Sequence, residues 1–219
     1  GWYRQEKTEK WIHTLPPETT LSESTRDALT GLINKGALKQ LNISYNALYG
    51  EGTKTLAEAF RSNSRMDLVM VELNLAGNNM GTVGALSIAN VIPIMSELTS
   101  LNVSDNGLGN EGSEAIAEAL RENKVMKHLD MSKNDAGAKC AQILADGVIA
   151  NGALVKFNIS DNKLFAPGTK VVAEALKGNQ IMTELNISGN YIGRNKASEY
   201  ADADMSGVIA ISDAIPTMG

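Results

Sequence analysis

The sequence contains few of the residues from which catalytic sites, metal sites and disulfides are built. Cys140 is the single cysteine among 219 residues, and His13 and His128 are the two histidines. One cysteine excludes an intrachain disulfide, and two histidines are too few for most zinc or acid–base sites. No glycine-rich phosphate-binding motif occurs. We therefore predict no enzyme and no cofactor, and expect Cys140 to serve in packing, with redox or nucleophilic chemistry as the alternative.

Long apolar runs and an excess of positive charge are also lacking. No segment approaches the roughly 18 to 20 apolar residues of a membrane helix, and the formal net charge is -5. Nucleic acids and anionic membranes require clustered Lys and Arg, so we expect neither nucleic-acid binding nor membrane insertion. The lone cysteine fits a reducing compartment, which predicts an intracellular, cytoplasmic protein. Organellar import after removal of a targeting peptide stays open, because the chain begins with Gly1.

A repeat is the most informative feature that the sequence does contain. Segments such as Leu98-Thr-Ser-Leu101-Asn-Val103-Ser-Asp-Asn106 recur six times, and the first asparagine spacing is 32 residues while the other four are 28. The closing asparagines are Asn46, Asn78, Asn106, Asn134, Asn162 and Asn190. Alternation of apolar and polar residues predicts a half-exposed strand in each unit. An asparagine side chain can bond the backbone of a turn, so we interpret these asparagines as a structural ladder.

The second half of each unit predicts a helix. Apolar residues at Ala115, Ile116, Ala119 and Leu120 form one helical face, and the other units repeat them. Aligned units place Leu56, Ile88, Ile116, Leu144 and Val172 at one position, and Phe60, Ile92, Leu120, Val148 and Leu176 at the next. Small residues recur beside them at Ala57, Ala89, Ala117, Ala145 and Ala173. We expect these positions to form a continuous core in which helix and strand layers approach closely.

The pattern Leu-x-x-Leu-x-Leu-x-x-Asn with one helix per unit resembles the leucine-rich-repeat family, and the 28-residue period is similar to its ribonuclease-inhibitor-like subfamily. The resemblance implies an α/β solenoid shaped as a horseshoe arc, with parallel strands on the concave face and helices on the convex face. We expect residues 22–219 to be the leucine-rich-repeat domain, with six strand motifs, and residues 1–21 to be an N-terminal extension or cap.

The ends and one insertion depart from the repeat. We expect Trp2, Trp11 and Leu15 to cap the first helix, roughly residues 24–34, with a tether as the alternative. Gly219 stands just before the position of another strand, so we expect the full protein to continue, or this open end to make an end-to-end contact. An insertion near residues 194–204 carries Glu199, Asp202 and Asp204. A solvated loop is the favoured interpretation, and calcium binding by these carboxylates is the alternative.

The outward strand positions are the predicted partner-binding surface. The candidates on the strands are Gln40, Asn42, Glu72, Asn74, Ser100, Asn102, His128, Asp130, Lys156, Asn158, Glu184 and Asn186, and those just beyond them are Tyr45, Asp105, Lys133 and Asp161. A merely solvated polar strand surface is the competing interpretation for each of them. His128 and Asp130 could also form a proton-transfer pair. Few aromatic or arginine anchors occur on this face, so modest affinity is expected.

We predict a non-catalytic protein–protein interaction module or scaffold that recognises a protein through the solenoid surface. The alternatives are a small-GTPase activator, an actin-associated cap similar to the C-terminal part of tropomodulin, and a structural segment of a larger assembly. An activator would need a specific projecting residue on the solenoid edge, and nothing in the sequence singles out actin. The sequence predicts a fold more sharply than a function, because one fold serves many partners.

Overall fold

The fold is an open six-stranded parallel sheet in which the strands follow chain order. The structure is a computed structural model that describes residues 2–4, 11–13, 31, 38–62, 70–195 and 203–218. The strands are β3 (Gln40–Asn42), β4 (Glu72–Asn74), β5 (Ser100–Asn102), β6 (His128–Asp130), β7 (Lys156–Asn158) and β8 (Glu184–Asn186). Equivalent residues of successive repeats pair, so that Leu73 lies opposite Leu101. The predicted six strand motifs are confirmed.

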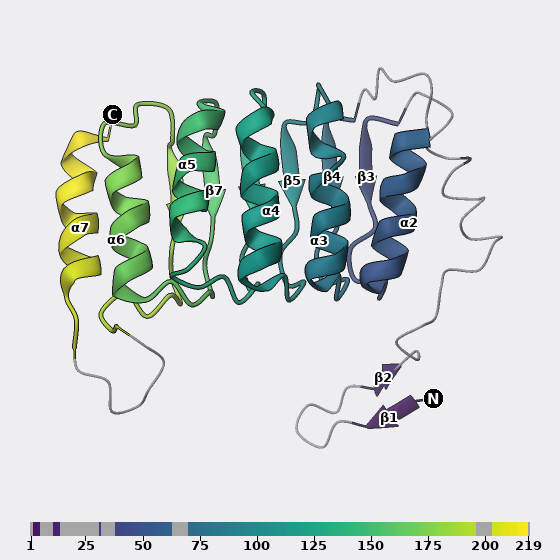
Figure 1. The fold of residues 1–219 in the computed structure, drawn as a ribbon, viewed down its shortest axis with the longest axis horizontal. Helices are drawn as coiled ribbons and strands as arrows, with labels where there is room; N and C mark the ends of the chain where they lie inside the picture. Colours follow the sequence, from purple (N-terminus) through teal and green to yellow (C-terminus); the bar gives the residue numbers. More distant parts are fainter. Residues whose placement is uncertain are drawn as a thin grey trace.

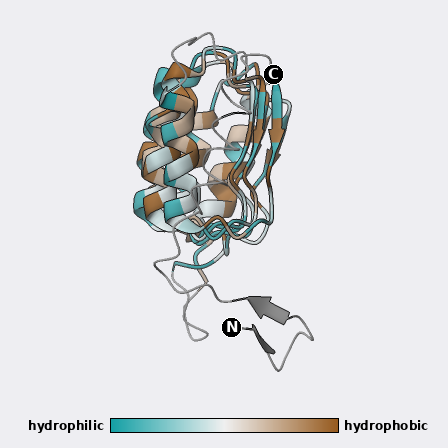
Figure 2. Ribbon diagram, turned by 90° about the vertical axis from the view of Figure 1, so that its right-hand side faces the viewer, coloured by the Kyte–Doolittle hydropathy of each residue, from teal (hydrophilic) through white to brown (hydrophobic). Residues whose placement is uncertain are grey.

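A layer of helices covers one face of this sheet (Figure 1). The helices are α2 (Tyr49–Ser62), α3 (Gly81–Ala89), α4 (Gly109–Glu122), α5 (Ala141–Asn151), α6 (Phe165–Leu176) and α7 (Ser206–Ala214), with 3-10 turns η1 (Ile92–Ile94) and η2 (Ile215–Thr217). Figure 2 shows the helix and strand layers edge on, and the buried hydrophobic residues of both layers form one core cluster. Among the described residues, no helix has both the length and the apolar character needed to span a bilayer.

The predicted core positions are buried between the layers. Leu56, Ile88 and Leu144 expose at most 1% of their surface, and the ten residues predicted at the two aligned positions are all buried. In the last repeat the aligned Ile215 is 63% exposed. Their alanine neighbours are buried as well. A Cβ on Gly147 of α5 would lie 2.6 Å from the carbonyl oxygen of Ala117 on α4. A small residue is therefore required where α5 touches α4. The recurring alanines were expected to let the helix and strand layers approach, so this contact between two helices is a separate finding.

The asparagine ladder is also confirmed. Asn106 Oδ1 accepts hydrogen bonds from the backbone N–H of Asn78 at 2.9 Å and of Met80 at 3.3 Å. Its Nδ2 donates to the carbonyl oxygens of Leu75 at 2.9 Å and Val103 at 3.0 Å. Equivalent bonds connect the other repeats through Asn78, Asn134, Asn162 and Asn190. From Asn78 onward, each ladder residue thus ties its own turn to the turn of the preceding repeat.

A second set of asparagines, which the sequence interpretation overlooked, shapes the turns after the helices. Asn123 Oδ1 accepts from the backbone N–H of Val125 at 2.9 Å and Met126 at 2.7 Å. Asn151 and Asn179 accept comparable bonds in the next two repeats. Their spacing of 28 residues was visible in the sequence. These side chains end the helix and start the return to the next strand.

Near the N-terminus the described backbone pairs β1 (Trp2–Arg4) with β2 (Trp11–His13) in antiparallel fashion. The predicted cap contacts of Trp2, Trp11 and Leu15, the boundary at residue 21 and all but Gly31 of the expected first helix lie outside the described residues or side chains. The same holds for residues 63–69, 196–202 and 219. These expectations stay predictions. Cys140 aligns with Gly112 of α4 and Gly168 of α6, from which a helical position would be expected, but it lies one residue before α5.

Candidate functional site

A hollow of about 340 Å³ lies on the sheet face opposite the helices and extends over β4 to β8. Its polar lining consists of Glu72, Asn74, Ser100, Asn102, His128, Asp130, Lys156, Asn158, Glu184 and Asn186. The residues between them on β4 to β7, such as Leu101 and Phe157, are buried in the core, and Leu185 on β8 is partly buried against it. Period-two alternation therefore produces both surfaces, because successive side chains leave opposite sides of the sheet. The hollow unites ten residues that the sequence predicted as outward.

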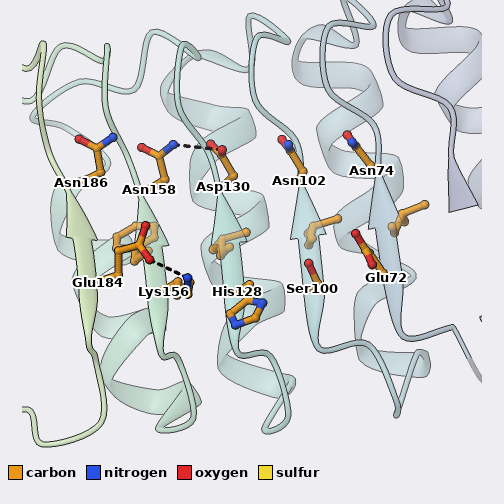
Figure 3. A pocket seen from close by; sticks show the side chains of 14 residues that line it. Glu72, Asn74, Ser100, Asn102, His128, Asp130, Lys156, Asn158, Glu184 and Asn186 are labelled. Carbon is orange, nitrogen blue, oxygen red and sulfur yellow. Dashed lines mark hydrogen bonds and ion pairs between the residues drawn. The ribbon is translucent and has the colours of Figure 1, made fainter. Parts of the chain in front are cut away.

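The lining residues form two rows that run across the strands (Figure 3). We call Gln40, Glu72, Ser100, His128, Lys156 and Glu184 the charged row, and Asn42, Asn74, Asn102, Asp130, Asn158 and Asn186 the amide row. Each row takes one residue from each strand. Gln40 and Asn42 on β3 continue the rows but do not line the hollow.

One ion pair joins two neighbouring residues of the charged row. Lys156 Nζ lies 2.7 Å from Glu184 Oε2, and both side chains remain more than half exposed. The hydrogen bond from Lys156, followed by the charge of Lys156, lowers the pKa of Glu184. Within the described residues, no ion pair engages Glu72 or His128. The two groups remain available for contacts with a partner.

The amide row has a common orientation that the backbone imposes. The Oδ1 atom of Asn102 accepts from the backbone N–H of Ser104 at 2.9 Å, and Asn74 accepts from Ala76 at 3.1 Å in the same way. Every other member of the row makes this bond to the residue two positions later. A backbone N–H requires an oxygen acceptor, so the amide nitrogen faces outward. Among described residues, none accepts from Nδ2 of Asn42, Asn74, Asn102 or Asn186.

Asp130 is the one carboxylate in the amide row. Its Oδ1 accepts from the backbone N–H of Ser132 at 2.9 Å and from the Ser132 hydroxyl at 2.7 Å, while its Oδ2 accepts from Asn158 Nδ2 at 3.0 Å. Within the described part of the chain, no hydrogen bond joins Asp130 to His128. The geometry therefore does not support the alternative in which His128 and Asp130 form a proton-transfer pair.

The remaining predicted residues lie in turns at the edge of the sheet. Tyr45, Asp105, Lys133 and Asp161 all have positive φ, between 53° and 58°. None of them lines the hollow. Tyr45 remains 71% exposed, and its ring leaves no space for a Cβ on Gly77. The structure therefore separates these four residues from the strand residues with which the sequence had grouped them.

An aromatic pair at this edge was missed. The rings of Phe165 and Tyr191 stack with centroids 5.6 Å apart and an interplanar angle of 22°. Both residues have positive φ, where the aligned repeats carry Gly109 or Gly107. Bulky residues at such φ values are uncommon. Phe165 stands where three other repeats carry Gly81, Gly109 and Gly137, and this departure was a signal in the sequence that could have revealed the pair.

Cys140 and Asp204, the other residues considered for chemistry, lie in surroundings that favour a structural role. Burial, followed by the negative charge of Glu114, raises the pKa of Cys140 to about 11, and its Sγ donates to the carbonyl oxygen of Gly137. The thiol is therefore protonated at neutral pH, as expected for packing. Asp204 Oδ1 accepts from the backbone N–H of Ser206 at 3.0 Å, beside the start of α7. The described residues contain no group of His, Cys, Asp or Glu suited to a metal ion.

Comparison with known proteins supports the fold. A family model described as Leucine Rich repeat matches residues 69–89 and 96–117. No curated protein matches the chain. The Caenorhabditis elegans tropomodulin C-terminal domain is 12% identical, with a TM-score of 0.53 over 88% of this chain and 92% of that chain. A structure described as Leiomodin-1 Actin-Binding Site 2 is 17% identical, with a TM-score of 0.49 over 90% of this chain and 91% of that chain.

The family match and the likeness to the tropomodulin domain agree with the geometry of the described residues. Two matched repeats cover the chain around β4, α3 and β5, and the same strand–helix unit recurs along the sheet. At 12% identity, the likeness to the tropomodulin domain concerns the fold alone. The chain is a leucine-rich-repeat α/β solenoid.

Proposed function

We propose that the chain is a non-catalytic protein–protein interaction module that binds a protein partner on the strand face. The observation that carries this proposal is the hollow over β4 to β8, whose polar lining comes from five consecutive strands. Residues on strands are held more firmly than residues on loops, because ladder bonds and core packing fix their backbone. The strand face can therefore present a preformed surface that loses little entropy when a partner binds.

The lining chemistry favours modest affinity. The outward residues of the hollow include no aromatic residue and no arginine, and those residues dominate the tightest contacts in many interfaces. Exposed ion pairs such as Lys156–Glu184 contribute little, because water and salt screen them. A partner that makes many polar contacts, each weak, fits this surface. The sixteen residues predicted from sequence remain the proposed contact set, with the hollow as its centre.

An actin-associated role is the second candidate. The repeat pattern suggested it, and the solenoid likeness to the tropomodulin C-terminal domain is its support. The ribonuclease-inhibitor-like subclass likewise remains a proposal, supported by the 28-residue spacing and a helix in each repeat. Small-GTPase activation, assembly through the chain ends and a cytoplasmic location also stay predictions.

The test compares two matched variants as baits in a cell lysate. The strand-face variant carries Glu72→Ala, His128→Ala, Lys156→Ala and Glu184→Ala. The helix-face control carries Glu58→Ala, Glu118→Ala, Lys170→Ala and Gln142→Ala, which are exposed and give the same change in charge. We expect a partner that the native chain and the control retain and the strand-face variant loses.

If the helix-face control loses the partner and the strand-face variant retains it, the binding surface is on the helices and the strand-face proposal is overturned. Equal retention by all three baits would contradict it as well. Purified filamentous actin, sedimented with each bait, tests the second candidate separately. Co-sedimentation that the strand-face variant abolishes would make actin the partner, and absence of co-sedimentation would remove actin.

A further inference from the structure

The amide row offers hydrogen-bond donors and hardly any acceptors. Asn74 and Asn102 each use Oδ1 for the backbone of their own turn and direct Nδ2 outward. Asn186 does the same on β8, where the backbone N–H and hydroxyl of Ser188 both bond its Oδ1. A partner must therefore bring acceptors to this row. Free backbone carbonyl groups are the most abundant neutral acceptors that a protein segment can supply.

The carboxylates of the hollow lie on every second strand. Glu72 belongs to β4, Asp130 to β6 and Glu184 to β8. Neighbouring strands lie about 4.8 Å apart, so successive carboxylates are separated by roughly 9.6 Å measured across the strands. Asp130 also lies two residues further along its strand than Glu72 and Glu184 do, because it belongs to the amide row. Glu184 is paired with Lys156, which leaves Glu72 and Asp130 as the uncompensated charges of the hollow. The surface is therefore complementary to positive charges with the same spacing.

One backbone conformation satisfies both features. An α-helix uses its carbonyl groups internally, so it cannot supply a row of acceptors. A β-extended segment repeats about every 6.8 Å on one side, which does not match the carboxylate spacing. A polyproline II segment rises about 3.1 Å per residue, repeats every three residues in about 9.3 Å and leaves all its carbonyl groups free. Its third-residue repeat matches two strand spacings.

We propose that the strand-face hollow binds an extended protein segment in the polyproline II conformation that crosses the strands and carries Lys or Arg at every third residue. The carbonyl groups accept from the outward Nδ2 atoms of the amide row. The basic side chains contact Glu72, Asp130 and, at the third position, Glu184. This inference rests on the proposed function, since it names the chemistry of the partner for the same surface.

The experiment uses a defined peptide and the full chain. The peptide Ac-(Lys-Pro-Pro)3-NH2 places three lysines roughly 9.3 Å apart. Nuclear magnetic resonance of the labelled chain follows the side-chain amides of Asn74, Asn102 and Asn186. We expect these signals to shift with a dissociation constant of about 0.1 to 1 mM, since exposed polar contacts are individually weak. Raising the salt concentration should weaken binding, because exposed charges are screened.

Three control peptides separate charge, spacing and conformation. Ac-(Glu-Pro-Pro)3-NH2 reverses the charge, Ac-(Lys-Pro-Pro-Pro)3-NH2 changes the spacing, and Ac-(Lys-Gly-Gly)3-NH2 removes the preformed backbone. We expect each to bind at least threefold more weakly than the first peptide, since a flexible or mismatched segment loses more entropy or fewer contacts. Equal binding by any of the three would overturn the corresponding part of the proposal, and equal binding by all would overturn it entirely.

A protein variant tests the carboxylates without disturbing the fold. Asp130→Asn restores the residue that the other five repeats carry, and Glu72→Gln keeps the shape of an exposed side chain. We expect this double variant to bind the lysine peptide about threefold to tenfold more weakly. Glu58→Gln with Glu118→Gln, on the helices, should leave binding unchanged. Equal effects of the two double variants would contradict the proposed site.

The result also separates this inference from the proposed function. If the lysine peptide shifts no strand-face signal while the strand-face variant still loses its protein partner, the partner chemistry is wrong and the binding face is right. If the variant retains the partner and the peptide shifts no signal, both are wrong.

Discussion

The ladder and the amide row, whose asparagines lie four residues apart in every repeat except the one with Asp130, show how one side chain can serve two purposes. Asn106 of the ladder is 1% exposed, and the backbone consumes both its oxygen and its nitrogen. Asn102 of the amide row bonds one N–H of its own turn and keeps its nitrogen on the surface. The ladder asparagine holds successive repeats together, whereas the amide-row asparagine leaves a group available to a partner.

The largest expected effect is on the ladder. Asn106→Ala would leave buried backbone groups of two repeats without partners, and each such group costs about 1 to 3 kcal/mol. We expect the free energy of unfolding to fall by about 3 to 5 kcal/mol, measured by urea denaturation followed by circular dichroism. Asn46→Ala is the matched control at the edge of the ladder, since Asn46 is exposed and, among the described residues, its amide bonds only its own turn. A loss for Asn106→Ala no larger than that for Asn46→Ala would contradict the ladder's role between repeats.

The amide row should be much less sensitive. Asn102→Ala removes the acceptor of the Ser104 N–H, a single bond near the surface, so the free energy of unfolding should fall by about 1 kcal/mol. The same denaturation measurement gives the comparison with Asn106→Ala. A loss above about 3 kcal/mol would mean that both rows are structural, and the distinction between them would fail.

A buried polar group without a partner provides the reverse case. Among described buried side-chain atoms, Ser113 Oγ and Thr169 Oγ1 make no hydrogen bond, and the position of Ser113 is alanine at Ala85 and Ala141. Ser113→Ala should raise the free energy of unfolding by roughly 0.5 to 1 kcal/mol, because it removes an unsatisfied hydroxyl at little packing cost. Thermal denaturation measures the change. A lower melting temperature for Ser113→Ala than for the native chain would show that this hydroxyl has a hydrogen-bond partner in solution.

The smallest effect concerns the charged row. Lys156→Met should return the pKa of Glu184 toward its ordinary value, which a nuclear magnetic resonance titration of the Glu184 carboxyl carbon would measure. A pKa lowered by folding stabilises the folded chain above the unfolded-state pKa, and this contribution is lost as the pH falls through the folded-state pKa. In the Lys156→Met variant, the free energy of unfolding should therefore depend less on pH in the acid range, because the contribution of this ion pair is gone. An unchanged pKa would show that the ion pair does not persist in solution.

The sequence alone was sufficient for the architecture. A strand of alternating residues such as Leu101 and Asn102 has one buried face and one exposed face, and a fixed period places equivalent residues of the next strand beside them. The ladder followed for the same reason, because Asn106 recurs where alternation stops and the chain turns. Local periodicity and the repeat length determine these features, so no knowledge of distant contacts was needed.

Only the tertiary structure shows which groups the exposed side chains contact. The bonds from Asn158 to Asp130 and from Lys156 to Glu184 join residues 28 positions apart, and their geometry depends on how neighbouring strands pair. The outward direction of each amide nitrogen, the separation of Tyr45 from the hollow and the stacking of Phe165 on Tyr191 depend on turn geometry in the same way. A repeat in sequence fixes which face a side chain occupies, while its partners on that face are set by packing between repeats.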